Sequence, residues 1–319
     1  MFTVETTLGP LPPGDLGRID AHEHVIIDGG LMTVKHPEFK LDSVQKAVEE
    51  VGRWRTAGGG AIVDACPIGA GRRVDQLVRV SRETGIPILV PTGFHSISNY
   101  LPDHWQHRYS EEQIAELMLA ECTEGLEYGG YDGPLVDRST VKAGLLKVAA
   151  DYHYIGPTTA KIIRAAGRVH ARCAIPILVH TETGTAGDET LDAFESAGVP
   201  ASRVLLSHID RNPDPALHLR LARRGAFLQY DTPTRVKVQP ASVAIELMRA
   251  LFRAGLGDKL CLGGDMARRT YWRAYGGGPG LDYLLTSFTA RLEEEGFDQS
   301  ELDAIWHDNP VSWLTGGAA

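Results

Sequence analysis

Residue types that bind metals stand at the ends of several apolar runs in this sequence. His22 and His24 are one residue apart, so an extended strand would turn both imidazoles to the same side. His180, His208 and Asp265 each end another apolar run. Any one of these residues could be a surface residue or a hydrogen-bonded core residue. Five such groups on one rim of a barrel would be hard to satisfy without a metal ion, so together they predict a metal site.

Lys147 is a further candidate, because it lies within the apolar run 143–149. Lysine is rarely buried, and an ammonium beside four histidines would be costly to desolvate and would repel a cation. Reaction of its amine with carbon dioxide would give a carbamate, an anionic oxygen ligand able to bridge two metal ions. The alternative is an unmodified lysine that pairs with Asp265 or extends its ammonium toward the solvent.

Strands and helices alternate along the chain as they do in parallel sheets. Eight short apolar runs predict strands, and an amphipathic stretch after each run predicts a helix. Ser110 and Gln113 predict a capping box at the start of the third helix, and Gly85 is one of several glycines placed where a helix should end. The predicted strands are residues 18–26, 61–66, 86–92, 143–149, 175–181, 204–209, 226–230 and 260–265. The predicted helices are residues 41–57, 74–84, 110–127, 158–172, 188–197, 215–224, 241–254 and 281–295.

This pattern favours an α/β fold of the closed (β/α)8 TIM-barrel type. An open doubly wound sheet would usually carry a glycine-rich turn after its first strand, and that turn is absent from the sequence. No linker or change in composition divides the chain, so we expect residues 1–319 to form one barrel domain. The long connections 92–109, 150–157 and 266–280 would then lie at the carboxyl ends of the strands, where barrels build their active sites.

Composition and charge favour an enzyme that acts on small molecules. The 32 Lys and Arg residues against 41 Asp and Glu residues give a net charge of -9, which offers no net attraction to nucleic acid or to an anionic membrane. No apolar run approaches the ~18 residues that span a bilayer, and the first residues do not resemble a signal peptide. We therefore expect a cytoplasmic protein. The four cysteines have no paired spacing, which indicates reduced thiols.

The sequence resembles the phosphotriesterase-like family of the amidohydrolase superfamily over nearly the whole chain. The resemblance rests on the order and spacing of Thr7-Leu8-Gly9-Pro10, His22-Glu23-His24, Ala143-Gly144-Leu145-Leu146-Lys147-Val148, Val179-His180-Thr181, Leu206-Ser207-His208 and Gly264-Asp265. It implies an amidohydrolase-type barrel with two divalent metal ions, and a homodimer as its assembly. Zinc is the first expectation, and manganese, cobalt and iron accept the same ligands. The resemblance implies that the more buried ion is bound by His22, His24 and Asp265, that the second is bound by His180 and His208, and that carboxylated Lys147 and a hydroxide bridge the two.

Such a centre predicts hydrolysis without a serine or cysteine nucleophile. Two divalent ions about 3.5 to 4 Å apart can ionise a bridging water at neutral pH and polarise an oxygen of the substrate. Asp265 would bind one ion through one oxygen, and its other oxygen could accept the proton and pass it to the leaving alkoxide. Asp265 and Lys147 are therefore the predicted catalytic residues. Lactones, carboxyl esters and phosphotriesters all suit this chemistry, so the ligands predict a metal-dependent hydrolase and leave its substrate open.

Cationic residues after the seventh and eighth predicted strands predict an anionic group on the substrate. Residues 232–237 and 266–275 carry these cations, and barrels commonly bind phosphate at this place. Residues 267–280 resemble the branch of the family that opens lactones of phosphorylated sugar acids. By that resemblance the phosphate would be held by Lys237, Arg268 and Tyr271. The loop 94–100 departs from the aromatic pattern that the resemblance leads us to expect near the metals.

The leading hypothesis is a binuclear-metal lactonase acting on a phosphorylated sugar-acid lactone, with a small-molecule substrate and a second copy of the chain as its expected partners. An organophosphate triesterase or an acyl-homoserine-lactone hydrolase with the same metal centre is the alternative. The substrates of those enzymes are neutral, so a cationic mouth argues against them. A non-catalytic ligand-binding barrel is the alternative of another class. It predicts that a ligand position has been lost, and all six are present.

Overall fold

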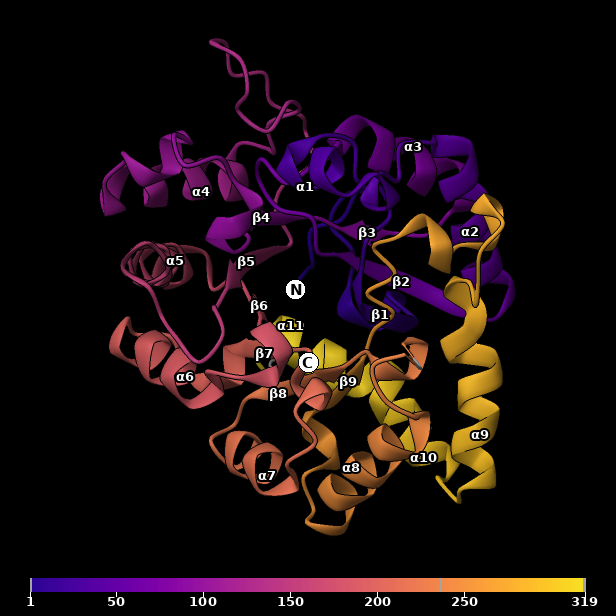
Figure 1. The fold of residues 1–319 in the computed structure, drawn as a ribbon. Helices are drawn as coiled ribbons and strands as arrows, with labels where there is room; N and C mark the ends of the chain where they lie inside the picture. The colour runs from indigo at the N-terminus through magenta and orange to yellow at the C-terminus, as the bar shows by residue number, and fades with distance from the viewer. Residues whose placement is uncertain (1, 236, 318–319) are drawn as a thin grey trace.

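The strands form a parallel barrel surrounded by helices (Figure 1). The computed structural model describes residues 2–235 and 237–317. The strands are β1 (Arg18–Glu23), β2 (Gly59–Asp64), β3 (Ile88–Leu89), β4 (Pro91–Gly93), β5 (Leu145–Ala149), β6 (Ile177–His180), β7 (Val204–Ser207), β8 (Phe227–Tyr230) and β9 (Leu260–Leu262). Only Val90 separates β3 from β4, and both lie at the predicted strand 86–92. The predicted order of eight strands and the TIM-barrel class are therefore confirmed.

The barrel closes between β9 and β1. Neighbouring strands pair in parallel in the orders β1-β2-β3 and β4-β5-β6-β7-β8-β9. The backbone N–H of Asp265 donates to the His22 carbonyl oxygen at 2.8 Å, which joins the last strand end to the first. Gly263 permits this approach because it has no Cβ atom. A Cβ atom at this position would lie only 2.7 Å from the His22 backbone nitrogen. A Cβ atom at Gly264 would collide with the carboxylate of Glu23.

Helices cover the outside of the strands (Figure 1). Ser110 makes the predicted capping box with Gln113, and Gly85 ends its helix in the left-handed conformation. The helical segment 281–294 contains two irregular stretches before its last turns. The segment 299–315 is also helical and was not expected from the sequence. The helices are α1 (Gly30–Lys35), α2 (Val44–Thr56), α3 (Val74–Thr84), α4 (Glu111–Thr123), α5 (Pro157–Cys173), α6 (Gly187–Ser196), α7 (Pro215–Arg223), α8 (Ala241–Arg253), α9 (Thr289–Glu294), α10 (Gln299–Asp303) and α11 (Asn309–Thr315).

The buried apolar residues form an outer layer between strands and helices and an inner layer within the barrel. The inner layer contains Leu145, Leu178 and Leu205 from neighbouring strands, and Trp313 of α11 packs against it. Two residues farther along β5 and β6, the same strand faces carry Lys147 and His180. The barrel interior is thus apolar toward the amino ends of the strands and polar toward their carboxyl ends, which is where the site lies.

All four cysteines are free thiols. Among the helices of residues 2–235 and 237–317, none is long and apolar enough to cross a membrane.

Candidate metal centre

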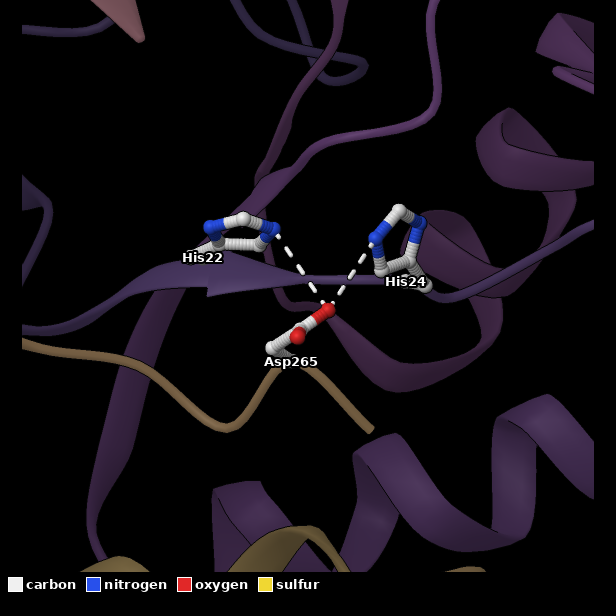
Figure 2. Close-up of side chains that lie close together, drawn as sticks. All are labelled: His22, His24 and Asp265. Carbon is white, nitrogen blue, oxygen red and sulfur yellow. Dashed lines mark ion pairs between the residues drawn. The ribbon is translucent and has the colours of Figure 1, made fainter. Parts of the chain in front are cut away.

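The structure brings three predicted ligands together at the junction of the first and last strands. Figure 2 shows the Asp265 carboxylate between the two imidazoles of His22 and His24. Asp265 Oδ1 lies 3.6 Å from His22 Nε2 and 3.4 Å from His24 Nε2. All three residues are buried, and their ligand atoms lie within 4.8 Å of one another, which is close enough to share one metal ion.

An irregularity in β1 turns the two histidines to the site. Ile19 and Ala21 belong to the inner apolar layer, so continued alternation would also turn Glu23 inward. The register with β2 shifts between Asp20 and Glu23. Beyond this shift His22 and His24 line the pocket instead. Such a shift can re-aim side chains next to a functional site.

His180 and His208 form the other side of the centre. Their rings lie 4.6 Å apart between centroids, and the His208 ring lies 4.9 Å from that of His22. Burial, together with Arg211 and His180, lowers the pKa of His208 well below its ordinary value. The imidazole is therefore neutral at neutral pH, as a metal ligand must be.

Asp231 orients His208 and was missed by the sequence reasoning. Its carboxylate accepts a hydrogen bond from His208 Nδ1, which leaves His208 Nε2 free to bind a metal ion. Asp231 could also be a ligand, since its oxygen lies with atoms of His208 and Asp265 in a second compact group. A signal was available, because Asp231 directly follows β8 just as His208 directly follows β7.

Lys147 lies where the sequence predicts it, inside the barrel and only 1% exposed. Within the described residues its Nζ atom has no hydrogen-bond partner, and the expected alternative of a direct pair with Asp265 does not form. Burial lowers the pKa of its amine to about 8. A buried amine without a partner fits a side chain that carries a further group, such as the predicted carbamate.

The backbone around Asp265 is held by acidic side chains of β1. Asp20 accepts a hydrogen bond from Gly264 N–H at 3.2 Å, and Glu23 accepts one from Met266 N–H at 2.6 Å. Asp265 itself has a φ of 43°, in the left-handed region that non-glycine residues rarely adopt. The contacts from β1 stabilise this conformation and so fix the carboxylate between the histidines.

Two arginines that the sequence reasoning did not single out also contact Asp265. Arg211 Nη2 lies 2.7 Å from Asp265 Oδ2 and 3.0 Å from Asp231 Oδ1, and Arg235 pairs with Asp265 as well. Burial alone would raise the pKa of the Asp265 carboxyl. Arg235, His24 and His208 outweigh that effect and hold the pKa well below its ordinary value. Asp265 is therefore a carboxylate at neutral pH.

These groups line a cavity of about 340 Å³ with walls of different character. Arg211, Arg235 and Arg268 are its cationic residues. Four neutral polar side chains from the loop after β4 also line the cavity, namely those of His95, Ser96, Ser98 and Asn99. Glu182 is an acidic residue of its lining.

The three predicted phosphate-binding residues have different positions. Arg268 lines the cavity, and its guanidinium lies over the Phe39 ring, 4.4 Å from the centroid. Tyr271 is not among the residues that line the cavity, and its hydroxyl lies 3.4 Å from Nη1 of Arg235, which does line it. Lys237 is exposed, and it is not among the described residues that line the cavity. Arg268 and Arg235 both line the cavity, and the phosphate-binding roles of Lys237, Arg268 and Tyr271 all stay predictions.

Comparison with known proteins places these residues in a family context. The model of the phosphotriesterase family matches residues 2–314. A phospho-furanose lactonase from Mycoplasmopsis agalactiae is 32% identical over 316 residues, covering 96% of this chain and 90% of its own. The crystal structure of an amidohydrolase from Mycoplasma synoviae matches with a TM-score of 0.95 and 30% identity, covering 98% of this chain and 91% of its own. A further match is the crystal structure of a phosphotriesterase homology protein from Escherichia coli, complexed with phosphate in its active site. Its TM-score is 0.86 at 29% identity, and the match covers 95% of this chain and 100% of its own.

Proposed function

The chain belongs to the phosphotriesterase family and is therefore a hydrolase, and on that premise we propose that it opens the lactone ring of a phosphorylated sugar acid. The family is one of binuclear metal enzymes, and the chain has candidate metal-binding groups. The observation that carries the proposal is the cationic side of the cavity next to the candidate ligands, where Arg268 meets the solvent. The name of the phospho-furanose lactonase relative supports the same substrate class.

The candidate ligands fit two divalent ions, for which zinc is our first expectation. His22, His24 and Asp265 would hold one ion, and His180 and His208 would hold the other. Lys147 would join them as a carbamate, because its amine is buried without a partner among the described residues. Carbamate formation joins the amine nitrogen to the carbon of carbon dioxide and releases one proton. When bound, the ions would lower the pKa of a water molecule and polarise the carbonyl group of the lactone.

Asp265 would carry the proton during ring opening. The water oxygen attacks the carbonyl carbon, and the Asp265 carboxylate accepts the proton of that water. The bond between the carbonyl carbon and the ring oxygen then breaks, and Asp265 returns the proton to the departing alkoxide. The product is a hydroxy acid. Asp231 supports this step by keeping His208 in one orientation.

Arg268 would bind the phosphate away from the reacting bond. Its side chain is 40% exposed and pairs with Glu38 at 3.4 Å, so it can exchange this partner for an incoming anion. Arginine suits phosphate because its planar guanidinium donates two parallel hydrogen bonds. Arg235, beside Asp265 and Tyr271, would add positive charge on the same side.

Steady-state kinetics on matched phosphorylated and unphosphorylated aldonolactones test the proposal. The metal-loaded protein should prefer the phosphorylated compound. A charge-assisted hydrogen bond contributes about 1.5 to 3 kcal/mol, so Arg268→Ala should lower kcat/KM for that compound by about 10- to 150-fold. The same substitution should barely affect the unphosphorylated compound. Equal losses on both would show that Arg268 shapes the loop without binding phosphate, and turnover of neutral phosphotriesters alone would contradict the lactonase proposal.

A further inference from the structure

His95 is a histidine of the cavity wall for which the proposed metal centre has no role. It lies two residues after β4, in the loop that carries Ser96 and Asn99 into the cavity. Its ring lies 4.8 Å from that of His180, measured between centroids. The side chain is therefore close enough to the candidate ligands to touch a substrate bound at them.

Hydrogen bonds determine which nitrogen of His95 carries a hydrogen. The backbone N–H of Ser96 donates to His95 Nδ1 at 2.7 Å, and the Asn99 side-chain amide lies 2.8 Å from the same atom. A backbone N–H can only donate, so Nδ1 is an acceptor and bears no hydrogen. The neutral ring must then carry its hydrogen on Nε2.

This tautomer makes His95 a hydrogen-bond donor and unsuited to metal binding. A histidine that binds a metal through Nε2 carries its hydrogen on Nδ1, where the Ser96 N–H would oppose it. His208 shows the opposite arrangement, because its Nδ1 faces the carboxylate of Asp231. The two histidines of the same cavity are thus set by their neighbours for different tasks.

We propose that His95 is a further catalytic residue, whose Nε2–H donates a hydrogen bond to the carbonyl oxygen of the lactone as that oxygen gains negative charge. The inference rests on the proposed lactonase function. The carbonyl oxygen is favoured over the phosphate because the His95 ring lies beside the candidate ligand His180, whereas Arg268 lies over the Phe39 ring and pairs with Glu38. A neutral donor held in place by Ser96 and Asn99 needs no reorganisation when the charge develops, which is the property that makes such donors effective.

Two substitutions separate hydrogen bonding from packing. His95→Leu replaces the imidazole with an apolar side chain of similar bulk and so removes the hydrogen-bond donor. His95→Gln retains an N–H donor. Loss of one donor to a developing oxyanion typically costs about 10²- to 10³-fold in kcat, so His95→Leu should lose this much with little change in KM. His95→Gln should retain much more of the activity, and its kcat should show the same dependence on pH as that of the parent protein.

Metal content is the second readout. Both His95 variants, loaded with zinc and bicarbonate, should bind as much zinc per chain as the parent protein, while His180→Gln should bind less. His104→Gln is the matched control, since His104 lies in the same loop but packs its ring against Tyr100 and Trp105. It reports any general disturbance of the loop and should leave kcat within about threefold of the parent value.

Several results would overturn the inference. Loss of zinc from His95→Leu in proportion to activity would make His95 a ligand. Equal kcat losses in His95→Leu, His95→Gln and the His104→Gln control would reduce its role to packing. An increase in KM alone would mean that His95 binds the ground state of the substrate. If the parent protein opens no lactone, the proposed function itself fails and this inference with it, whereas an active parent with a fully active His95→Leu contradicts only the role of His95.

Discussion

The buried ion pair between Arg72 and Glu121 gives the most exacting test of how the fold is stabilised. Arg72, in the segment between β2 and α3, contacts Glu121 of α4 through two hydrogen bonds of 2.9 and 2.6 Å. Both side chains are 0% exposed. Arg72 also donates to the Pro91 carbonyl oxygen at 2.7 Å. The pair therefore connects three parts of the barrel without access to solvent.

Arg72→Met should destabilise the protein strongly, because it leaves the Glu121 carboxylate buried without its cation. Removing one partner of a buried pair costs about 3 to 5 kcal/mol. A chain of 319 residues has an unfolding entropy of about 0.7 kcal/mol per kelvin, so the Tm should fall by about 4 to 8 °C. The loss should appear in urea unfolding followed by circular dichroism, as a lower midpoint with an unchanged slope.

The double variant Arg72→Met/Glu121→Leu distinguishes the missing charge partner from a general packing defect. It should be more stable than Arg72→Met alone, since no unpaired charge remains in the core. Arg79→Met is the control, because Arg79 pairs with Glu83 at 2.7 Å on the exposed surface of α3, and it should cost less than about 1 kcal/mol. The reasoning is refuted if Arg72→Met costs no more than this control, or if the double variant is the less stable of the two.

Three further substitutions test the centre itself. Lys147→Ala should lose most activity and bound metal, with partial recovery in the presence of a small carboxylic acid; a fully active variant would remove the bridging role of Lys147. Asp265→Asn should lower kcat by about 10²- to 10⁴-fold, as measured by steady-state kinetics. A loss of only a few-fold with metal content intact would assign the proton transfer to another group. Asp231→Asn should weaken metal binding or activity by about 10- to 100-fold, because His208 loses the carboxylate that orients it. Competition with a chelator measures this affinity, and an unchanged value would leave Asp231 without an orienting role.

The strand order and most candidate ligands could be predicted from local patterns. Apolar runs predict strands because a parallel barrel buries both faces of each strand. His180 and Asp265 follow such runs, so their place at the carboxyl ends follows from the chain itself. Lys147 could be singled out because a charged residue within an apolar run conflicts with its surroundings.

Other residues of the site depend on contacts that no local pattern reveals. Arg211 lies three residues beyond His208, and the residues around it in the sequence do not indicate which carboxylates it will contact. Its pairing with Asp231 and Asp265 arises only when three strand ends are brought side by side. The helical segment 299–315 was also missed, although Asp298 and Glu301 form a capping box at its start and were a local signal. Its Trp313 packs against the inner layer of the barrel.

The sequence by itself determined which side chains stand at the carboxyl ends of the strands, because strand length and alternation are local properties of the chain. Only the tertiary structure decided how these side chains meet. Closure of β9 against β1 places Asp265 between His22 and His24, and Asp20 and Glu23 hold its backbone there. The tautomer of His95 likewise depends on a folded loop. Distances and hydrogen bonds between groups far apart in the chain exist only after the barrel has closed.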